Sequence, residues 1–412
     1  MKKNIGKWIV AICGLILCIV TLFIINKSSH KADTPRAKYI FLFVADGMSH
    51  THVSMTESYM SYKAGKVGGE RLAFSSLPYC GNVETYSLDS PVTCSAAAGT
   101  AIATGVKTKS RSVGRGPEGE ALKSFAFDLQ NDGYRIGIIS NAPINHATPA
   151  CFYSSPVDRD EFYLISQDIP KSGFDFFASP GFKEFYSRRE GDPDIETFIE
   201  SNGYTVCWGK EEFAERKSET DKIVICNLDN KGRDAIDYMA DGTVDADDYT
   251  LPEMVSAGIE FLSDEKPFFI MCEAGTIDWA AHINKTLPTI KLVQELDEAV
   301  KAALEFYKSH PDETLIVVTS DHETGGATIG YGNVYRKDQP LWHILDSAWT
   351  AAGEKNVLNW DDNQKLNEAA RIGWTTNYHT GGDVPVYAIG KGAERFCGKM
   401  NNTDFKAKIL AE

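Results

Sequence analysis

The sequence has few cysteines, and they lack the spacing that is typical of disulfide-rich or zinc-finger proteins. Its 412 residues include only nine cysteines, and no two of them stand in C-x-x-C spacing. Two lie in an N-terminal apolar run, which leaves Cys80, Cys94, Cys151, Cys207, Cys226, Cys272 and Cys397. This odd number argues against a disulfide framework, so most of them should be small buried side chains. A pair between Cys207 and Cys226 stays open in an oxidising compartment.

Positive charge is also scarce. The chain has 42 Lys and Arg residues against 57 Asp and Glu, which gives a formal net charge of -15. Such an acidic surface argues against a nucleic acid as a specific partner, because that binding depends on phosphate contacts. A small anionic substrate is not excluded, since bound metal ions can reverse the local field. The length and the 43% hydrophobic content are sufficient for one large core.

One long apolar run, Trp8–Ile25, stands apart from the rest of the chain. It has 18 uncharged residues, follows three lysines and approaches the length of a bilayer span. No clean A-x-A site follows it, so an uncleaved membrane anchor at residues 8–25 and a cleaved signal peptide both stay open. We predict that residues 1–34 form this signal or anchor plus a linker. The chain from residue 35 onward is then expected in the periplasm or outside the cell.

Short apolar runs rich in Val, Ile and Phe recur along the remaining chain. They do not alternate with polar residues, which is typical of strands buried on both faces. The runs are Tyr39–Ala45, Tyr134–Ser140, Lys222–Cys226, Pro267–Cys272, Thr314–Ser320 and Val384–Ile389. Helical patterns such as Gly119–Asp132 and Thr289–Ser309 separate several of them. This order predicts an α/β fold with a large, mostly parallel central sheet between helices.

Two stretches interrupt this alternation. Ser187–Ala246 is polar and acidic, and we interpret it as an excursion from the sheet or a surface insertion. Gly330–Trp374 carries four of the seven tryptophans. It could be a cap over a site, or a packed peripheral segment, which we slightly prefer. Both are treated as insertions within one domain at residues 35–412.

Polar residues follow three of the predicted strands directly. Asp46 follows the first run, Glu273 follows Cys272, and Asp321 and His322 follow Ser320. Ligands of open parallel sheets bind beyond the carboxyl ends of the strands. Each of these residues alone is more often a turn or cap residue, but together they predict a site.

Ser95 precedes an Ala-rich stretch that should be helical. By itself it is best explained as a helix N-cap. The same position presents free N–H groups to a phosphate, and metal coordination could activate the hydroxyl for attack. Cys94 is interpreted as a packing neighbour of Ser95 rather than as the nucleophile.

Further metal-binding side chains occur elsewhere. Asp278 and His282 are four residues apart, so a helix would place both on one face, where they can chelate one ion. His379 precedes a glycine turn, Thr148 offers a hard oxygen ligand, and Arg159 offers a planar fork for two phosphate oxygens. Imidazole with carboxylate suits zinc, whereas oxygen ligands alone suit magnesium.

Taken together, these segments resemble the alkaline phosphatase family, in the same order from about Tyr39 to Gly390. The resemblance implies a large, mostly parallel sheet between helices. It also implies a hydrolase of small phosphate monoesters that acts through a phosphoserine, with two Zn²⁺ ions and one Mg²⁺ ion. A homodimer stays open.

The resemblance assigns a role to each residue. Ser95 would be the nucleophile, and Arg159 would hold the phosphate oxygens. The first zinc would be held by Asp278, His282 and His379. The second zinc would contact Ser95 and be held by Asp46, Asp321 and His322. The third ion, usually magnesium, would be held by Asp46, Thr148 and Glu273.

The chain departs from the family at a few positions. Cys94 stands where many members have an aspartate that orients the arginine, so Arg159 should be either looser or held differently here. His146 lies near Thr148, which leaves the identity of the third ion open. The alternative function is a related metallo-hydrolase that acts on phosphodiesters, sulfates or phosphonates. A third ion and an arginine favour monoesters, because both serve a dianionic phosphoryl group.

Overall fold

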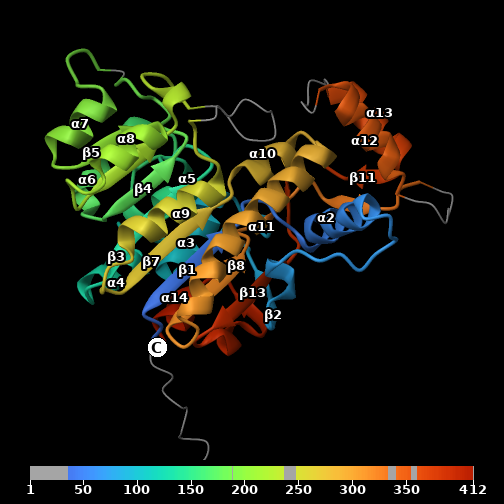
Figure 1. Ribbon diagram of the computed structural model, residues 1–412, viewed down its shortest axis with the longest axis horizontal. Coiled ribbons are helices and arrows are strands. Elements are labelled where there is room, and N and C mark those ends of the chain that lie inside the picture. The colour runs from blue at the N-terminus through green and yellow to red at the C-terminus, as the bar shows by residue number, and fades with distance from the viewer. Residues whose placement is uncertain (1–35, 188, 236–246, 333–339, 354–359, 412) are drawn as a thin grey trace, which may run out of the picture.

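The computed structural model describes residues 36–187, 189–235, 247–332, 340–353 and 360–411 (Figure 1). The predicted signal or anchor at residues 1–34 lies outside these residues. Among the helices that are described, none is both long enough and apolar enough to cross a membrane.

A sheet of ten strands forms the centre of the molecule, in the order β14-β2-β13-β8-β1-β7-β3-β4-β6-β5. The strands are β1 (Tyr39–Val44), β2 (Tyr79–Glu84), β3 (Arg135–Ser140), β4 (Phe176–Ser179), β5 (Thr205–Trp208), β6 (Ile223–Cys226), β7 (Phe268–Glu273), β8 (Thr314–Thr319), β13 (Val384–Gly390) and β14 (Gly398–Asn401). All six predicted strands are confirmed. Only β13 runs antiparallel to its neighbours in this sheet, so the mostly parallel fold is confirmed as well.

Two small sheets lie outside the central one. One pairs β9 (Glu323–Thr324) with β12 (His379–Thr380), and the other pairs β10 (Ala327–Ile329) with β11 (Ile372–Trp374). The β9–β12 pair is antiparallel and places His379 opposite Thr324. This register brings His379 close to the segment that contains Asp321 and His322.

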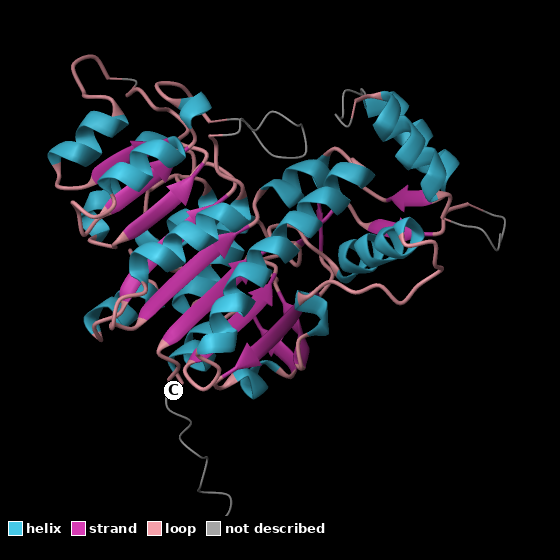
Figure 2. Ribbon diagram, viewed as in Figure 1, coloured by secondary structure: helices cyan, strands magenta, loops and turns pink. Residues whose placement is uncertain are grey.

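Helices cover both faces of the central sheet (Figure 2). They are α2 (His50–Lys63), α3 (Ser95–Thr104), α4 (Phe125–Asn131), α5 (Ala147–Tyr153), α6 (Phe162–Ser172), α7 (Ile195–Ser201), α8 (Gly209–Arg216), α9 (Leu251–Leu262), α10 (Thr276–His282), α11 (Thr286–Ser309), α12 (Trp342–Ala351), α13 (Trp360–Ala370) and α14 (Asp404–Leu410). Apolar residues do not alternate with polar ones in β1 because its side chains enter a core on each face of the sheet. Ile40 and Leu42 enter one core with α3 and α5, while Phe41 and Phe43 enter the other with α9 and α11. Both faces of the strand are therefore buried.

The helical prediction for Gly119–Asp132 is wrong in its first half, because α4 begins only at Phe125. Residues before it form a turn closed by a bridge between Arg115 and Ala121. The glycines and Pro117 in this stretch favour a turn over a helix. The second predicted helix is confirmed, since α11 ends at Ser309.

We expected the polar stretch 187–246 to be an excursion from the sheet or a surface insertion, but its described strands stay within the central sheet. It supplies β5 and β6, which extend the central sheet at one edge. Whether this edge is an insertion stays a prediction. In the stretch 330–374, α12, α13 and β11 pack against α2 and α11 around Met55, Ile290 and Trp342.

Cys207 and Cys226 lie on the neighbouring strands β5 and β6, but they do not pair. Cys207 is opposite Ile225, and Cys226 is opposite Trp208. This offset of one residue sends the two side chains to opposite faces of the sheet and into different cores. All seven cysteines of the described residues are free thiols.

Candidate metal centre

The carboxyl ends of β8, β1 and β7 form the floor of the site. These strands are parallel neighbours, and their register aligns Val44 with Glu273 on one side and with Thr319 on the other. Asp46 stands two residues after Val44, and Asp321 stands two residues after Thr319. The side chains that the sequence placed at separate strand exits therefore meet at one edge of the sheet, where all three carboxylates are buried.

One group of possible metal ligands consists of Asp278, His282 and His379, and their ligand atoms lie within 4.8 Å of one another. Helix α10 places Asp278 and His282 on one face, as predicted, with Oδ2 and Nε2 3.2 Å apart. Strand β12 adds His379, whose Nε2 is 3.2 Å from Nε2 of His282.

The hydrogen bonds of the Nδ1 atoms determine the tautomers of His282 and His379. Nδ1 of His282 is 2.7 Å from the carbonyl oxygen of Asn377, and Nδ1 of His379 is 2.8 Å from that of Thr93. A carbonyl oxygen can only accept, so each Nδ1 carries the proton and donates it. In the neutral rings, two unprotonated Nε2 atoms then face each other. A cation between them removes this repulsion, and the geometry therefore fits a bound metal ion.

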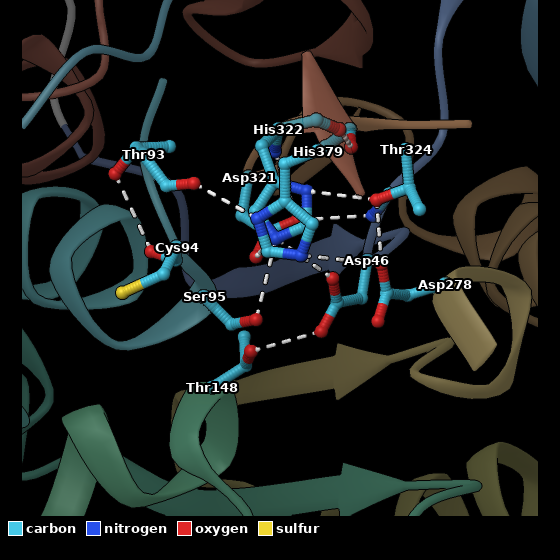
Figure 3. A network of polar contacts seen from close by, with 12 residues as sticks. Asp46, Thr93, Cys94, Ser95, Thr148, Asp278, Asp321, His322, Thr324 and His379 are labelled. Atoms are coloured by element: carbon cyan, nitrogen blue, oxygen red, sulfur yellow. Dashed lines mark hydrogen bonds and ion pairs between the residues drawn. The ribbon is translucent and has the colours of Figure 1, made fainter. Parts of the chain in front are cut away.

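A second group consists of Asp46, Asp321 and His322, again with ligand atoms within 4.8 Å. Nε2 of His322 is 3.3 Å from Oδ1 of Asp46 and 3.4 Å from Oδ2 of Asp321. Both carboxylate oxygens are buried and have no hydrogen-bond partner. The hydroxyl of Ser95 lies 3.3 Å from the same Nε2 (Figure 3). These buried oxygens and the imidazole have the chemistry of a metal site that includes the serine.

Thr148 and Glu273 lie beside the second group. The hydroxyl of Thr148, in the first turn of α5, is 3.4 Å from Oδ2 of Asp46. Ser140 donates a hydrogen bond to Glu273, whose Oε1 is buried and without a partner. Thr148 and Asp46 thus offer two adjoining oxygen donors, and Glu273 ends the neighbouring strand β7 opposite Val44, which suits an all-oxygen site.

The comparisons with known proteins agree with this geometry. The sequence model of the alkaline phosphatase family matches residues 37–178 and 178–411. The chain belongs to the alkaline phosphatase family. It is an enzyme of this class, a metal-dependent phosphatase, as the sequence predicted.

Individual alkaline phosphatases resemble the chain over most of its length. Alkaline phosphatase 4 of Bacillus subtilis is 29% identical over 93% of this chain and 90% of its own length. The repressible alkaline phosphatase of Saccharomyces cerevisiae is 26% identical and covers 97% of this chain and 84% of its own. The structure of the alkaline phosphatase from the Antarctic bacterium TAB5 matches with a TM-score of 0.73 and 28% identity, covering 92% of this chain and 98% of that one. The Thermus thermophilus enzyme matches with a TM-score of 0.75 and 26% identity, covering 91% and 92% of the two chains.

The electrostatics of this alkaline phosphatase centre call for cations. Burial raises the pKa of Asp46 well above its usual range, and Asp321 and Asp278 raise it further, while Arg159 opposes them. Burial together with Asp278 raises the pKa of Asp321 to about 8, and burial raises that of Glu273 to about 7. Bound divalent ions would neutralise this negative charge and keep the carboxylates ionised.

The histidine of the second group is also suited to a metal. Burial lowers the pKa of His322 well below its usual range, and the neighbouring His379 lowers it further. The ring is therefore neutral at ordinary pH. Neutral imidazole is the form that binds metal ions.

Ser95 opens helix α3 as its first residue, with Cys94 as the N-cap. It is therefore not the cap that the sequence suggested. The positive end of the helix lies at the serine, where the free N–H groups of the first turn can face an anion. Cys94 packs against the core, as predicted, and its Sγ accepts a hydrogen bond of 3.2 Å from the backbone N–H of Arg111.

Arg159 acts on the alkaline phosphatase centre from a neighbouring loop. Its side chain is 16% exposed, and its charge lowers the pKa of Asp46, although burial and nearby acids dominate that pKa. Its Nε lies 3.9 Å from Oδ1 of Asp160. Nη2 of Arg111 is 2.6 Å from the other oxygen of Asp160 and 3.0 Å from Oδ1 of Asp158. Arg111 thus holds both carboxylates that flank Arg159 in sequence.

Sequence reasoning missed Arg111 and Thr324. Arg111 carries no motif, and its contacts to Asp158 and Asp160 exist only in the folded chain. Thr324 stands two residues after His322, and its position beside the predicted ligands Asp321 and His322 was the signal that could have found it.

Proposed function

We propose that this alkaline phosphatase hydrolyses small phosphate monoesters through a phosphoserine on Ser95. The observation that carries the proposal is the position of the Ser95 hydroxyl, 3.3 Å from Nε2 of His322 at the edge of the second ligand group. The same serine begins helix α3. One side chain therefore combines a nucleophilic oxygen, an adjoining metal-ligand group and the positive end of a helix.

We assign the ions by ligand chemistry. Asp278, His282 and His379 would hold one Zn²⁺, and Asp46, Asp321 and His322 would hold the other, because imidazole with carboxylate suits zinc. Asp46, Thr148 and Glu273 would hold Mg²⁺ through oxygen atoms alone. Structures of TAB5 alkaline phosphatase mutants at 27% identity have Mg bound in the M3 site, which supports a third ion. Bound ions would lower the pKa of the serine hydroxyl and neutralise the charge that develops on the reacting oxygens.

The residues of the chain supply the remaining steps. Oγ of Ser95 attacks the phosphorus atom, the bond to the substrate alcohol breaks, and water then releases phosphate from Ser95. The N–H groups at the start of α3 and the guanidinium of Arg159 hold the phosphoryl oxygens during both displacements. Most of the rate enhancement comes from this positioning and charge neutralisation, because phosphoryl transfer needs little covalent help.

A comparison of two substrates tests the proposal. The zinc- and magnesium-loaded enzyme should hydrolyse p-nitrophenyl phosphate faster than bis-p-nitrophenyl phosphate. A preference for the diester would instead favour the alternative class of phosphodiester, sulfate or phosphonate hydrolases. Ser95→Ala should lose most turnover and retain its metal content. Mass spectrometry of the enzyme quenched in acid should locate the phosphoryl group on the peptide that contains Ser95.

We also propose that the enzyme acts in the periplasm or outside the cell, with residues 1–34 as its signal or tether. The apolar run at 8–25 and the preceding lysines support this location. Fractionation of cells that express the full chain, followed by N-terminal sequencing, would separate a tethered form from a cleaved one. Activity confined to the cytoplasm would contradict the proposal.

A further inference from the structure

Thr324 lies between the two metal-ligand groups and belongs to neither. It is fully buried in β9. Its Oγ1 is 2.5 Å from Oδ1 of Asp278 in the first group and 3.3 Å from Nδ1 of His322 in the second (Figure 3). Within the described chain, this one hydroxyl thus contacts a ligand of each group.

The direction of both hydrogen bonds follows from the chemistry of the partners. A hydroxyl has one proton to donate and two lone pairs that accept. An ionised carboxylate only accepts, so Thr324 donates to Asp278. The proton between Thr324 and His322 must then belong to Nδ1 of the imidazole. This leaves Nε2 of His322 unprotonated, and Nε2 is the atom that faces Asp46 and Ser95.

The surrounding backbone holds the hydroxyl in place. The backbone N–H of Thr324 donates to the carbonyl oxygen of Gly47, at 3.1 Å, and β9 pairs Thr324 with His379. Gly47 has a φ of 75°, and a Cβ atom built on it would lie 2.9 Å from Oγ1 of Thr324. The glycine therefore leaves the space that this hydroxyl occupies.

We infer that Thr324 is a positioning residue that couples the two metal-ligand groups. Its hydroxyl orients the carboxylate of Asp278 and fixes the tautomer of His322, so that both present their free atoms to the ions. The inference rests on the proposed function, since it assumes that both groups bind metal. Groups that orient metal ligands in this way typically change metal affinity or activity by about 10- to 100-fold when removed.

The test compares two substitutions of Thr324. Thr324→Val keeps the branched shape and removes the hydroxyl, whereas Thr324→Ser keeps the hydroxyl. We expect Thr324→Val to lose zinc to a chelator about 10- to 100-fold faster than the wild type and to lower kcat by a similar factor. Thr324→Ser should restore most of both. The matched control is Thr289→Val in α11, which removes another buried threonine hydroxyl that donates to the carbonyl oxygen of Lys285.

Two outcomes would overturn the inference. One is a Thr324→Val enzyme whose zinc retention and kcat remain within about twofold of the wild type. The other is a Thr324→Ser enzyme as impaired as Thr324→Val, which would assign the effect to packing. Zinc retention is also measured in the Ser95→Ala background, where most turnover should be lost. An effect on retention there supports the coupling even if the phosphoserine proposal fails.

Discussion

His282 and His379 hold their Nε2 atoms 3.2 Å apart, while the Nδ1 atom of each ring donates to a backbone carbonyl oxygen. The carbonyl groups belong to Asn377 and Thr93, which come from loops far apart in sequence. The backbone therefore turns two nitrogen atoms, each a candidate metal ligand, toward one point.

Removal of His379 should empty the first ligand group. We expect His379→Ala to bind one zinc ion fewer per chain and to lose at least about 100-fold in kcat, because a direct ligand should matter no less than a group that orients one. Metal analysis after gel filtration and steady-state kinetics measure both. His310→Ala is the control, since His310 lies just before β8, at the amino ends of the parallel strands and away from the site. Unchanged zinc content in His379→Ala would contradict the assignment.

The metal-free protein should become less stable as the pH rises from about 7 to 9. The pKa of Asp321 is raised to about 8 and that of Glu273 to about 7, both mainly by burial, so the folded state holds protons that the unfolded state has released. This stabilisation is complete below the unfolded pKa values near 4 and is lost as the pH passes through the raised values.

The buried histidines do not offset this trend. Burial lowers the pKa of His52 to about 4 and that of His146 to about 3, so both rings are neutral in either state above about pH 7. Thermal unfolding with a chelator present, recorded at several pH values, gives the measurement. Saturating zinc should remove the decline, since it keeps the carboxylates ionised. A midpoint that rises between pH 7 and 9 without metal would disprove the prediction.

Loss of Arg111 should weaken phosphate binding more than it slows the chemical step. Arg111 holds Asp158 and Asp160 on either side of Arg159. The side chains of Arg111, Asp158 and Asp160 are each 56% exposed, whereas that of Arg159 is 16% exposed. We therefore expect Arg111→Ala to raise KM and the inhibition constant of inorganic phosphate only about two- to fivefold, since each exposed ion pair contributes up to about 1 kcal/mol. The value of kcat should change less.

The control for Arg111 is Arg216→Ala, which removes another exposed pair, with Glu200, outside the site. High salt should reduce the difference between Arg111→Ala and the wild type, because it screens exposed charges. Equal phosphate inhibition of both variants and the wild type would show that Arg159 needs no such support.

Gly47→Ala should impair zinc retention more than Thr324→Val does. The new methyl group would lie 2.9 Å from Oγ1 of Thr324 and 3.0 Å from Oδ1 of Asp278, so both side chains must shift. The left-handed backbone adds about 1 to 2 kcal/mol of strain. Gly65→Ala is a matched control, because Gly65 has a φ of 71° and nothing within 4 Å of its added Cβ. The rate of zinc loss to a chelator is compared between Gly47→Ala and Gly65→Ala. Similar rates would indicate that backbone strain, rather than contact with Thr324 and Asp278, causes the zinc loss.

The sequence by itself determined the six strands, the class of the sheet and the residues that follow the strand ends. These features are local: an apolar run without alternation is buried on both faces, and a polar residue after it lies at the strand exit. The four-residue spacing of Asp278 and His282 was sufficient to predict their shared helix face, which α10 confirms. The roles of these residues in catalysis stay predictions.

Only the tertiary structure decided which segments meet. The antiparallel direction of β13, the separation of Cys207 from Cys226 and the addition of β5 to the edge of the sheet depend on pairing between distant strands. The contact of Thr324 with Asp278 spans 46 residues and depends on a space left by Gly47. Periodicity shows which face of an element is buried, but it carries no information about the neighbour that buries it. The coupling of the two ligand groups through one hydroxyl is therefore a property of the fold.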